Sequence, residues 1–208
     1  MLQASLLVAA YEAGYFPMAQ DSGEIHWYSP DPRGILPIEA YHPSHRLLRV
    51  TRSGRLDVTV DRAFRDVMLA CAADRDEGTW INDEIVDSYC ALHEVGLAHS
   101  IEVWQEGALV GGLYGVSLRG AFFGESMFHR VTDASKVALW RLCGILETRG
   151  YQLLDIQWLT PFLATTGAIE IPRDDYLSLL QAAMRLDCRF EAGTVPRSPS
   201  FRRTPESS

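Results

Sequence analysis

Apolar and polar residues follow one another along the chain with a spacing that switches between helix and strand. Over residues 2–13 the apolar positions recur with helical spacing, and the pattern ends at Gly14, a residue that suits the end of a helix. The next four residues include a proline and break the pattern, and strand-like runs follow over 25–28 and 35–38. These elements predict a small N-terminal α/β domain over residues 1–41.

From residue 42 onward the pattern predicts a longer series of elements. Ser44 and Asn82 are suitable N-caps for two of the helices. Two tight turns, Glu106-Gly107 and Arg119-Gly120, separate three strand-like runs and predict an antiparallel meander. The expected order is a helix over 44–52, a strand over 56–60, helices over 62–73 and 83–95, strands over 99–104, 108–117 and 121–128, a helix over 133–149, a strand over 153–157 and a helix that starts at Pro172.

This order of elements is that of the N-acetyltransferase-like α+β fold. We therefore expect residues 42–195 to form one domain of this type. Pro, Ser and Arg dominate the end of the chain, so residues 196–208 are expected to be a disordered tail. A fold of this kind hosts several chemistries and does not identify the activity.

The composition is that of an ordinary globular protein: of the 208 residues, 47% are hydrophobic and 22% are charged. The apolar runs fall short of the roughly 20 residues that a membrane helix needs, and the start of the chain lacks the basic segment of a signal peptide. We expect a cytoplasmic protein with no membrane association, and nothing in the sequence requires more than a monomer.

Cysteine and histidine are spaced in a way that argues against a metal or redox site. The four cysteines stand singly without a CxxC pair, and the six histidines show no metal-binding spacing. We expect buried structural thiols, no metal and no cofactor. A catalytic cysteine would need a positioned base, which the sequence does not offer.

Charge is distributed unevenly. The chain as a whole carries −8, but residues 33–65 contain seven arginines against three acidic residues. Such a local basic patch suits binding to phosphates, and a solvated arginine-rich helix face explains it equally well.

Two polar motifs at the ends of predicted strands carry the candidate chemistry. Gly124-Glu125-Ser126-Met127-Phe128 ends one strand, and Asp155-Ile156-Gln157 ends the next strand after an intervening helix. The two carboxylates and the amide are therefore expected to meet above one sheet, beside Met127 and Phe128. This juxtaposition predicts a site for a cationic group next to a hydrophobic one.

A CoA-dependent acyltransferase is one activity that the fold suggests. That chemistry holds a pyrophosphate in a glycine-rich loop at the start of the helix after the meander. The corresponding residues here, 129–136, contain no glycine and place Asp133 at the helix N-terminus. The run Gly111-Gly112-Leu113-Tyr114-Gly115 lies in a strand and is a weak nucleotide signal. This alternative is therefore disfavoured.

Nine short motifs occur in one order between about residues 10 and 180. They are Phe16-Pro17-Met18, Trp27 to Arg33, Thr79-Trp80-Ile81, His99 to Glu102, Leu109 to Gly115, Gly124 to Phe128, Ala134-Ser135-Lys136, Asp155-Ile156-Gln157 and Ile171-Pro172-Arg173. In these motifs and their order the chain resembles the leucyl/phenylalanyl-tRNA–protein transferase family. Departures from the family pattern include His42 to Arg49 in the basic segment and Leu159 to Ala168 after the last predicted strand.

The resemblance implies transfer of Leu or Phe from aminoacyl-tRNA to the α-amino group of proteins with N-terminal Arg or Lys, which marks them for degradation. It leaves Met open as a third donor. It also implies catalytic roles for Glu125, Asp155 and Gln157. Glu125 and Asp155 would bind the cationic acceptor, and Gln157 would hydrogen-bond the amine or the reacting carbonyl. Asp155 would orient the ammonium and accept or relay its proton, although a carboxylate with a pKa of about 4 is a weak base, so positioning is the safer role.

The resemblance further assigns residues that bind the donor. The substrate-binding set comprises Met127, Phe122, Leu113, Leu139, Leu142, Leu154 and Tyr89, together with Trp80 and Trp27 as platforms on which the terminal adenosine stacks. Arg46, Arg49 and Arg52 are expected to contact the tRNA backbone. Met127, Leu139 and Leu142 also suit an ordinary core. A CoA-type acyltransferase and a non-catalytic module that binds tRNA or N-degrons remain the alternatives.

Overall fold

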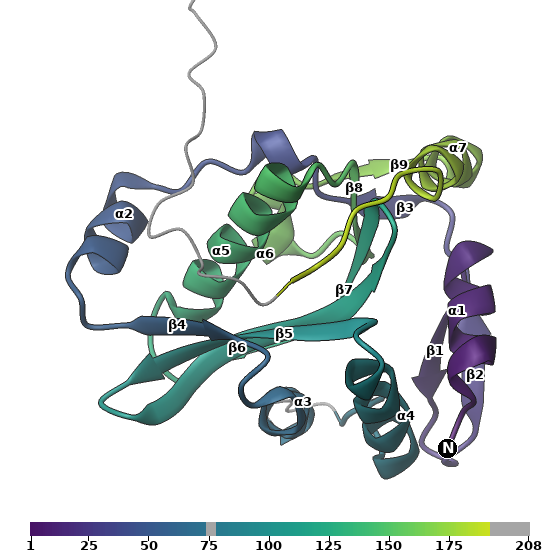
Figure 1. Cartoon of the computed structure of the whole chain (residues 1–208), viewed down its shortest axis with the longest axis horizontal. Coiled ribbons are helices and arrows are strands. Elements are labelled where there is room, and N and C mark those ends of the chain that lie inside the picture. Colours follow the sequence, from purple (N-terminus) through teal and green to yellow (C-terminus); the bar gives the residue numbers. More distant parts are fainter. Residues whose placement is uncertain (74–77, 192–208) are drawn as a thin grey trace, which may run out of the picture.

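Two β-sheets and seven α-helices build the part of the chain that the computed structural model describes, residues 1–73 and 78–191 (Figure 1). The strands are β1 (Phe16–Ala19), β2 (Ile25–Tyr28), β3 (Arg33–Ile35), β4 (Asp57–Val60), β5 (Ala98–Gln105), β6 (Ala108–Leu118), β7 (Ala121–His129), β8 (Leu153–Gln157) and β9 (Ile169–Ile171). The helices are α1 (Ala4–Glu12), α2 (His45–Arg52), α3 (Phe64–Ala73), α4 (Asp83–Glu94), α5 (Ala134–Arg149), α6 (Pro161–Ala164) and α7 (Arg173–Ala183), and a 3₁₀ turn covers Ile38–Ala40. The predicted tail, 196–208, lies outside the described residues.

The N-terminal unit consists of helix α1 and the hairpin of β1 and β2. The predicted helix ends where expected, with Gly14 in the left-handed region at φ 81°. The helix is broken before residues 15–18, as expected, but the strand Phe16–Ala19, which pairs antiparallel with Ile25–Tyr28, was not predicted. The strand expected over 35–38 is shifted: β3 covers Arg33–Ile35 and pairs in the large sheet between β8 and β9.

The large sheet has seven strands in the order β4-β5-β6-β7-β8-β3-β9. The predicted meander is confirmed, since β5, β6 and β7 pair antiparallel in sequence. Helix α5 then crosses over to β8, which runs parallel to β7. The observed order and pairing are those of the N-acetyltransferase-like α+β fold.

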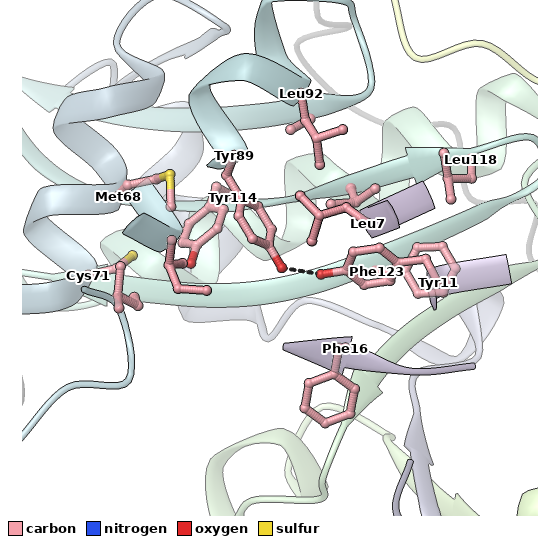
Figure 2. Packing of buried hydrophobic residues seen from close by; sticks show 14 of the residues in the cluster. Leu7, Tyr11, Phe16, Met68, Cys71, Tyr89, Leu92, Tyr114, Leu118 and Phe123 are labelled. Carbon is pink, nitrogen blue, oxygen red and sulfur yellow. Dashed lines mark hydrogen bonds between the residues drawn. The ribbon is translucent and has the colours of Figure 1, made fainter. Parts of the chain in front are cut away.

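Helices cover both faces of this sheet, with α3 and α4 on one face and α5 on the other (Figure 1). Neighbouring residues of β7 point to opposite sides, so Phe122 belongs to the core under α5 and Phe123 to the core under α3 and α4. Figure 2 shows the second of these cores, in which Tyr11 of the N-terminal unit packs beside Phe123. The N-terminal unit therefore shares a core with the large sheet.

Helix caps follow the predicted chemistry. Ser44 accepts a hydrogen bond from the Leu47 amide at 3.2 Å, and Asn82 accepts one from the Ile85 amide at 2.9 Å. Thr160 caps the short helix α6, which together with β9 was not predicted. Across the described ranges, 1–73 and 78–191, no helix has the length and apolar character to span a membrane.

Pairing between β7 and β8 is short, and this shapes the site. The two strands pair only from Ala121 and Leu153 to Phe123 and Asp155. Beyond that point β7 continues beside β6, whereas Gln157 at the end of β8 pairs with Gly34 of β3. Residues 124–128 and the end of β8 are therefore not bonded to each other through the backbone.

Candidate functional site

A cavity of about 340 Å³ lies where the pairing of β7 and β8 ends. Its wall is mainly apolar and comes from β6, β7, β8, α5, α6 and the N-terminal hairpin. The lining residues are Phe16, Met18, Trp80, Leu113, Tyr114, Gly124, Glu125, Ser126, Met127, Leu139, Leu142, Leu154, Ile156, Gln157, Trp158, Thr160, Phe162 and Leu163. Both motifs singled out in the sequence thus contribute to one wall, except for Phe128 and Asp155, which do not line it.

Most of the apolar residues expected to contact a donor side chain line this cavity. Five of them do so: Met127, Leu113, Leu139, Leu142 and Leu154. Phe122 does not line it: its side chain is fully buried in the same core under α5, beside Phe190. Tyr89 is also set back from the cavity, and its hydroxyl points at Glu125.

The aromatic side chains at the cavity differ from those expected. Trp80 is part of the wall, whereas Trp27 lies on β2 opposite Pro17 and outside the wall. Trp158 lines the cavity and is 42% exposed, with its ring packed against Phe16 and Tyr28. Sequence reasoning missed Trp158, although its position directly after Gln157 could have indicated it.

Glu125 is a partly exposed carboxylate in the cavity wall, held by three donors. Tyr11 donates to Oε1 at 2.7 Å, Tyr89 to Oε2 at 3.3 Å and the Gln157 amide to Oε1 at 3.3 Å. The two tyrosine hydroxyls also share a hydrogen bond with each other (Figure 2). Although part of the residue is exposed in the cavity, the protein surrounds its carboxylate; this desolvation, and to a lesser extent the charge of Asp155, raises the pKa of Glu125 from 4.5 to about 8.

Burial also holds the two tyrosines neutral. Desolvation raises the pKa of both Tyr11 and Tyr89 well above 10, and the charge of Glu125 adds to this. Both hydroxyls therefore keep their protons at neutral pH. Glu125 is then the group of this cluster that exchanges a proton near neutral pH.

Asp155 lies behind the cavity wall and is fully buried. Its carboxylate accepts hydrogen bonds from Arg33 Nε at 3.0 Å and Nη2 at 2.6 Å, from the Tyr176 hydroxyl at 2.8 Å and from the Gln157 backbone N–H at 2.9 Å. Every contact of this carboxylate that the structure gives is to the protein interior. The expected direct contact between Asp155 and an acceptor ammonium does not fit this geometry.

Gln157 stands in an unusual backbone conformation at the cavity. Its φ of 59° lies in the left-handed region, which non-glycine residues rarely adopt. The facing residue, Gly34, leaves room for this turn of the chain: a Cβ there would lie 2.9 Å from the backbone carbon of Trp158. The turn directs the Gln157 amide toward Glu125.

The three arginines expected to bind tRNA are exposed on helix α2. Arg46 Nε lies 3.1 Å from Asp133, the residue that precedes α5, and Lys136 lies 3.6 Å from the same side chain. Arg49 and Arg52 lie in the last turn of α2. Arg46 thus forms an ion pair at the start of α5. A CoA-type enzyme would need glycines there and a helix N-terminus free to bind the pyrophosphate.

Two family models match the chain. The model described as "Leucyl/phenylalanyl-tRNA protein transferase" matches residues 35–181, and the model of the N-terminal domain of the same family matches residues 1–31. The chain belongs to the leucyl/phenylalanyl-tRNA protein transferase family. Membership identifies the protein as an aminoacyltransferase and removes the ground for the CoA-type alternative.

Named members of the leucyl/phenylalanyl-tRNA protein transferase family match almost the whole chain. The protein of that name from Chlorobium luteolum is 48% identical over 91% of this chain and 100% of its own length. The one from Gluconobacter oxydans is 55% identical over 86% of this chain and 81% of its own length. Among solved structures, a functionally unknown conserved protein from Staphylococcus epidermidis matches with a TM-score of 0.47 and 9% identity, over 83% of this chain and 65% of that one.

Three residues around this candidate site were not recognised from the sequence as parts of it. Tyr11 comes from α1, Arg33 from β3 and Tyr176 from α7. Arg33 stands in the second of the nine motifs and was counted in the basic patch of residues 33–65, but it is fully buried and adds nothing to a surface patch. Tyr11 and Tyr176 fall in helical patterns where a tyrosine is an ordinary core residue.

Proposed function

We propose that this protein transfers leucine or phenylalanine from aminoacyl-tRNA to the α-amino group of proteins that begin with Arg or Lys, and so marks them for degradation. The observation that carries the proposal is the apolar cavity with Glu125 in its wall. Family membership supports the reaction class. The apolar wall of the cavity supports the assignment of a hydrophobic donor side chain, and Glu125 supports the assignment of a cationic acceptor.

The donor side chain occupies the apolar end of the cavity. Leu113, Leu139 and Leu142 are buried side chains that offer only carbon atoms to it. Such a wall favours Leu, Phe and Met over polar side chains, because a polar group there would lose its hydrogen bonds to water. A difference of one methylene is worth about 1–3 kcal/mol in such a pocket, so the site accepts more than one of these donors.

The acceptor amine lies beside Glu125. An α-ammonium group has a pKa of about 8, which matches the pKa of about 8 to which burial raises Glu125. Glu125 is therefore a stronger base than an ordinary carboxylate, and its pKa lies near the operating pH, as efficient acid–base catalysis favours. Glu125, rather than Asp155, is the proton acceptor in this proposal.

The reaction then needs little covalent chemistry from the protein. The neutral amine attacks the ester carbonyl, a peptide bond forms and the ester bond to the ribose breaks. The second amine proton goes to the departing ribose oxygen, and the proton on Glu125 returns to solvent. Gln157 orients the carboxylate and the amine, and alignment of the two substrates supplies most of the rate.

The rest of the donor extends from the cavity mouth. The terminal adenosine lies within one ester bond of the acyl group, so it stacks on an aromatic ring near the cavity, and Trp80 and Trp158 in the cavity wall are the candidates. Arg46, Arg49 and Arg52 contact the tRNA phosphates, which carry no sequence information and so allow several tRNAs. The protein works in the cytoplasm, as a monomer and without a cofactor.

A transfer assay with defined peptides tests the proposal. Purified protein is incubated with radiolabelled Leu-tRNA or Phe-tRNA and peptides that begin with Arg, Lys or Ala. Label is expected on the Arg and Lys peptides and at most weakly on the Ala peptide, and Nα-acetylation of the Arg peptide should abolish it. Failure of transfer with both donors would overturn the proposal, and binding of both substrates without transfer would identify a non-catalytic module instead.

A further inference from the structure

Arg33 is a fully buried arginine outside the cavity, and hydrogen bonds through Asp155 connect it to Gln157 in the cavity wall. Its guanidinium donates to both oxygens of Asp155 in a fork, through Nε at 3.0 Å and Nη2 at 2.6 Å. This arrangement satisfies the charge of both side chains away from water. A planar fork of this kind is a geometry that lysine cannot reproduce.

The same guanidinium connects three separate parts of the fold. Its Nη1 donates to the backbone carbonyl of Gly14 at 3.0 Å, directly after helix α1. The ring of Phe16 on β1 lies 4.9 Å from its central carbon, and the ring of Tyr176 on α7 lies 4.4 Å from it. Arg33 is therefore held between the N-terminal unit and α7, and it cannot move without disturbing both.

From Asp155 the contacts continue into the cavity. The oxygen that accepts from Arg33 Nε also accepts the backbone N–H of Gln157, at 2.9 Å. Gln157 has the left-handed φ of 59°, a conformation that persists in a non-glycine residue only when its surroundings hold it. Its side-chain amide then reaches Glu125 at 3.3 Å.

We propose that Arg33 is a positioning residue for aminoacyl transfer, which acts through Asp155 to hold the left-handed turn at Gln157 and so aim its amide at Glu125. The inference rests on the proposed function for the identity of the reaction. In this proposal Asp155 holds the backbone of Gln157, and the acceptor amine is contacted by Glu125 and Gln157. It also explains why the N-terminal unit matters for a site built on β7 and β8.

The first test compares Arg33→Lys with wild type in the Leu-tRNA transfer assay. Lysine keeps the positive charge beside Asp155 but cannot form the fork or the hydrogen bond to Gly14. We expect kcat to fall at least tenfold while the KM for Leu-tRNA changes by less than threefold. Unchanged kcat would overturn the proposal.

A double-mutant cycle shows whether Arg33 acts through Gln157. In a Gln157→Ala background there is no amide left to position, so Arg33→Lys should lower kcat by less than twofold further. If Arg33→Lys lowers kcat by the same factor with and without the Gln157 side chain, Arg33 has only a general structural role and the proposal fails.

Val103→Ala serves as the matched control for loss of stability. Val103 is fully buried on β5 and does not line the cavity. All kcat values are expressed per folded molecule, with the folded fraction measured by circular dichroism at the assay temperature. We expect Val103→Ala to lower the melting temperature but to keep kcat within twofold of wild type. A loss of kcat in this control as large as that in Arg33→Lys would count against the proposal.

Hydrogen exchange separates this proposal from the proposed function. The exchange rate of the Gln157 backbone amide, measured by NMR in ¹⁵N-labelled protein, does not depend on turnover. We expect it to rise at least tenfold in Arg33→Lys, with the amides of β5 unchanged. If wild type transfers neither Leu nor Phe, the proposed function fails, and this exchange rate alone decides whether Arg33 holds Gln157; an unchanged rate overturns that claim even in an active enzyme.

Discussion

The Tyr11 hydroxyl on helix α1 donates a 2.7 Å hydrogen bond to Glu125 on β7, across 114 positions of the chain. The N-terminal unit thus supplies a group in contact with the candidate proton acceptor. The hydrogen bond favours the charged form of Glu125 and opposes the effect of burial on its pKa. The proton affinity of Glu125 therefore depends on a residue of the N-terminal unit.

Loss of the Tyr11 hydroxyl should raise the pKa of Glu125 further above its ordinary 4.5. Glu125 accepts a proton only when it is ionised. In Tyr11→Phe the rise of kcat/KM with pH should therefore occur at a higher pH than in wild type. The measurement is kcat/KM against pH with an Arg peptide, whose amine titrates identically in both proteins. Tyr151→Phe, which removes a buried hydroxyl bonded to Ser117, is the control and should leave the profile unmoved.

Glu125 should also make the stability of the protein depend on pH. Its pKa is raised in the folded state, so between about pH 4.5 and 8 the folded state binds more protons than the unfolded state. The free energy of unfolding should then fall as pH rises, by up to about 1.4 kcal/mol per pH unit. Urea unfolding at pH 5.5, 6.5 and 7.5 should show this decrease in wild type and a shallower one in Glu125→Gln; parallel curves would contradict the shifted pKa.

Removal of one member of the Arg33–Asp155 pair should be costly. Asp155→Ala leaves the Arg33 charge buried without its partner, which typically lowers the free energy of unfolding by about 3–5 kcal/mol. The double variant Arg33→Met/Asp155→Leu removes both charges and should recover at least half of that loss. Urea denaturation of the three proteins tests this, and a double variant no more stable than Asp155→Ala would show that the charges themselves are not the cause.

A smaller cavity should discriminate between the two donors. Leu142→Phe adds bulk to the wall formed by α5 and should exclude the side chain of Phe more than that of Leu. We expect the ratio of kcat/KM for Phe-tRNA to that for Leu-tRNA to fall about tenfold, which corresponds to about 1.4 kcal/mol. Leu146→Phe places the same bulk one turn further along α5, where the residue is buried but does not line the cavity, and should keep the wild-type ratio.

Helix α2 should contribute to tRNA affinity through its charge. Replacement of the exposed Arg49 and Arg52 by Gln should weaken tRNA binding and reduce the slope of log K against log salt by about 0.7–0.9 for each phosphate that is no longer neutralised. Filter binding at several salt concentrations measures both effects. Arg65→Gln is the control, because Arg65 is exposed but already paired with Asp87 at 2.9 Å. An equal change in that control would mean that net charge, and not helix α2, is responsible.

Local chemistry explains which elements could be predicted from the sequence. Ser44, Asn82 and Gly14 act on the backbone within a few residues, so the helix ends that they mark were found correctly. The meander followed from its two turns in the same way. Strand β1 was missed because Pro17 suggests a break, and only pairing with β2 shows that the strand exists. Strand β9 and helix α6 are too short to give a periodic pattern.

The residues of the candidate site also fall into those that the sequence could predict and those that it could not. Sequence alone brought Glu125, Met127 and Gln157 to one place, because a single crossover helix makes the strands on either side of it neighbours. It could not show that Asp155 turns away from that place to pair with Arg33, 122 positions earlier, or that Tyr11 and Tyr89 stand behind Glu125. Whether a carboxylate faces a ligand or the interior depends on the side chains that pack behind it. Those side chains come from distant parts of the chain and are brought together only by folding.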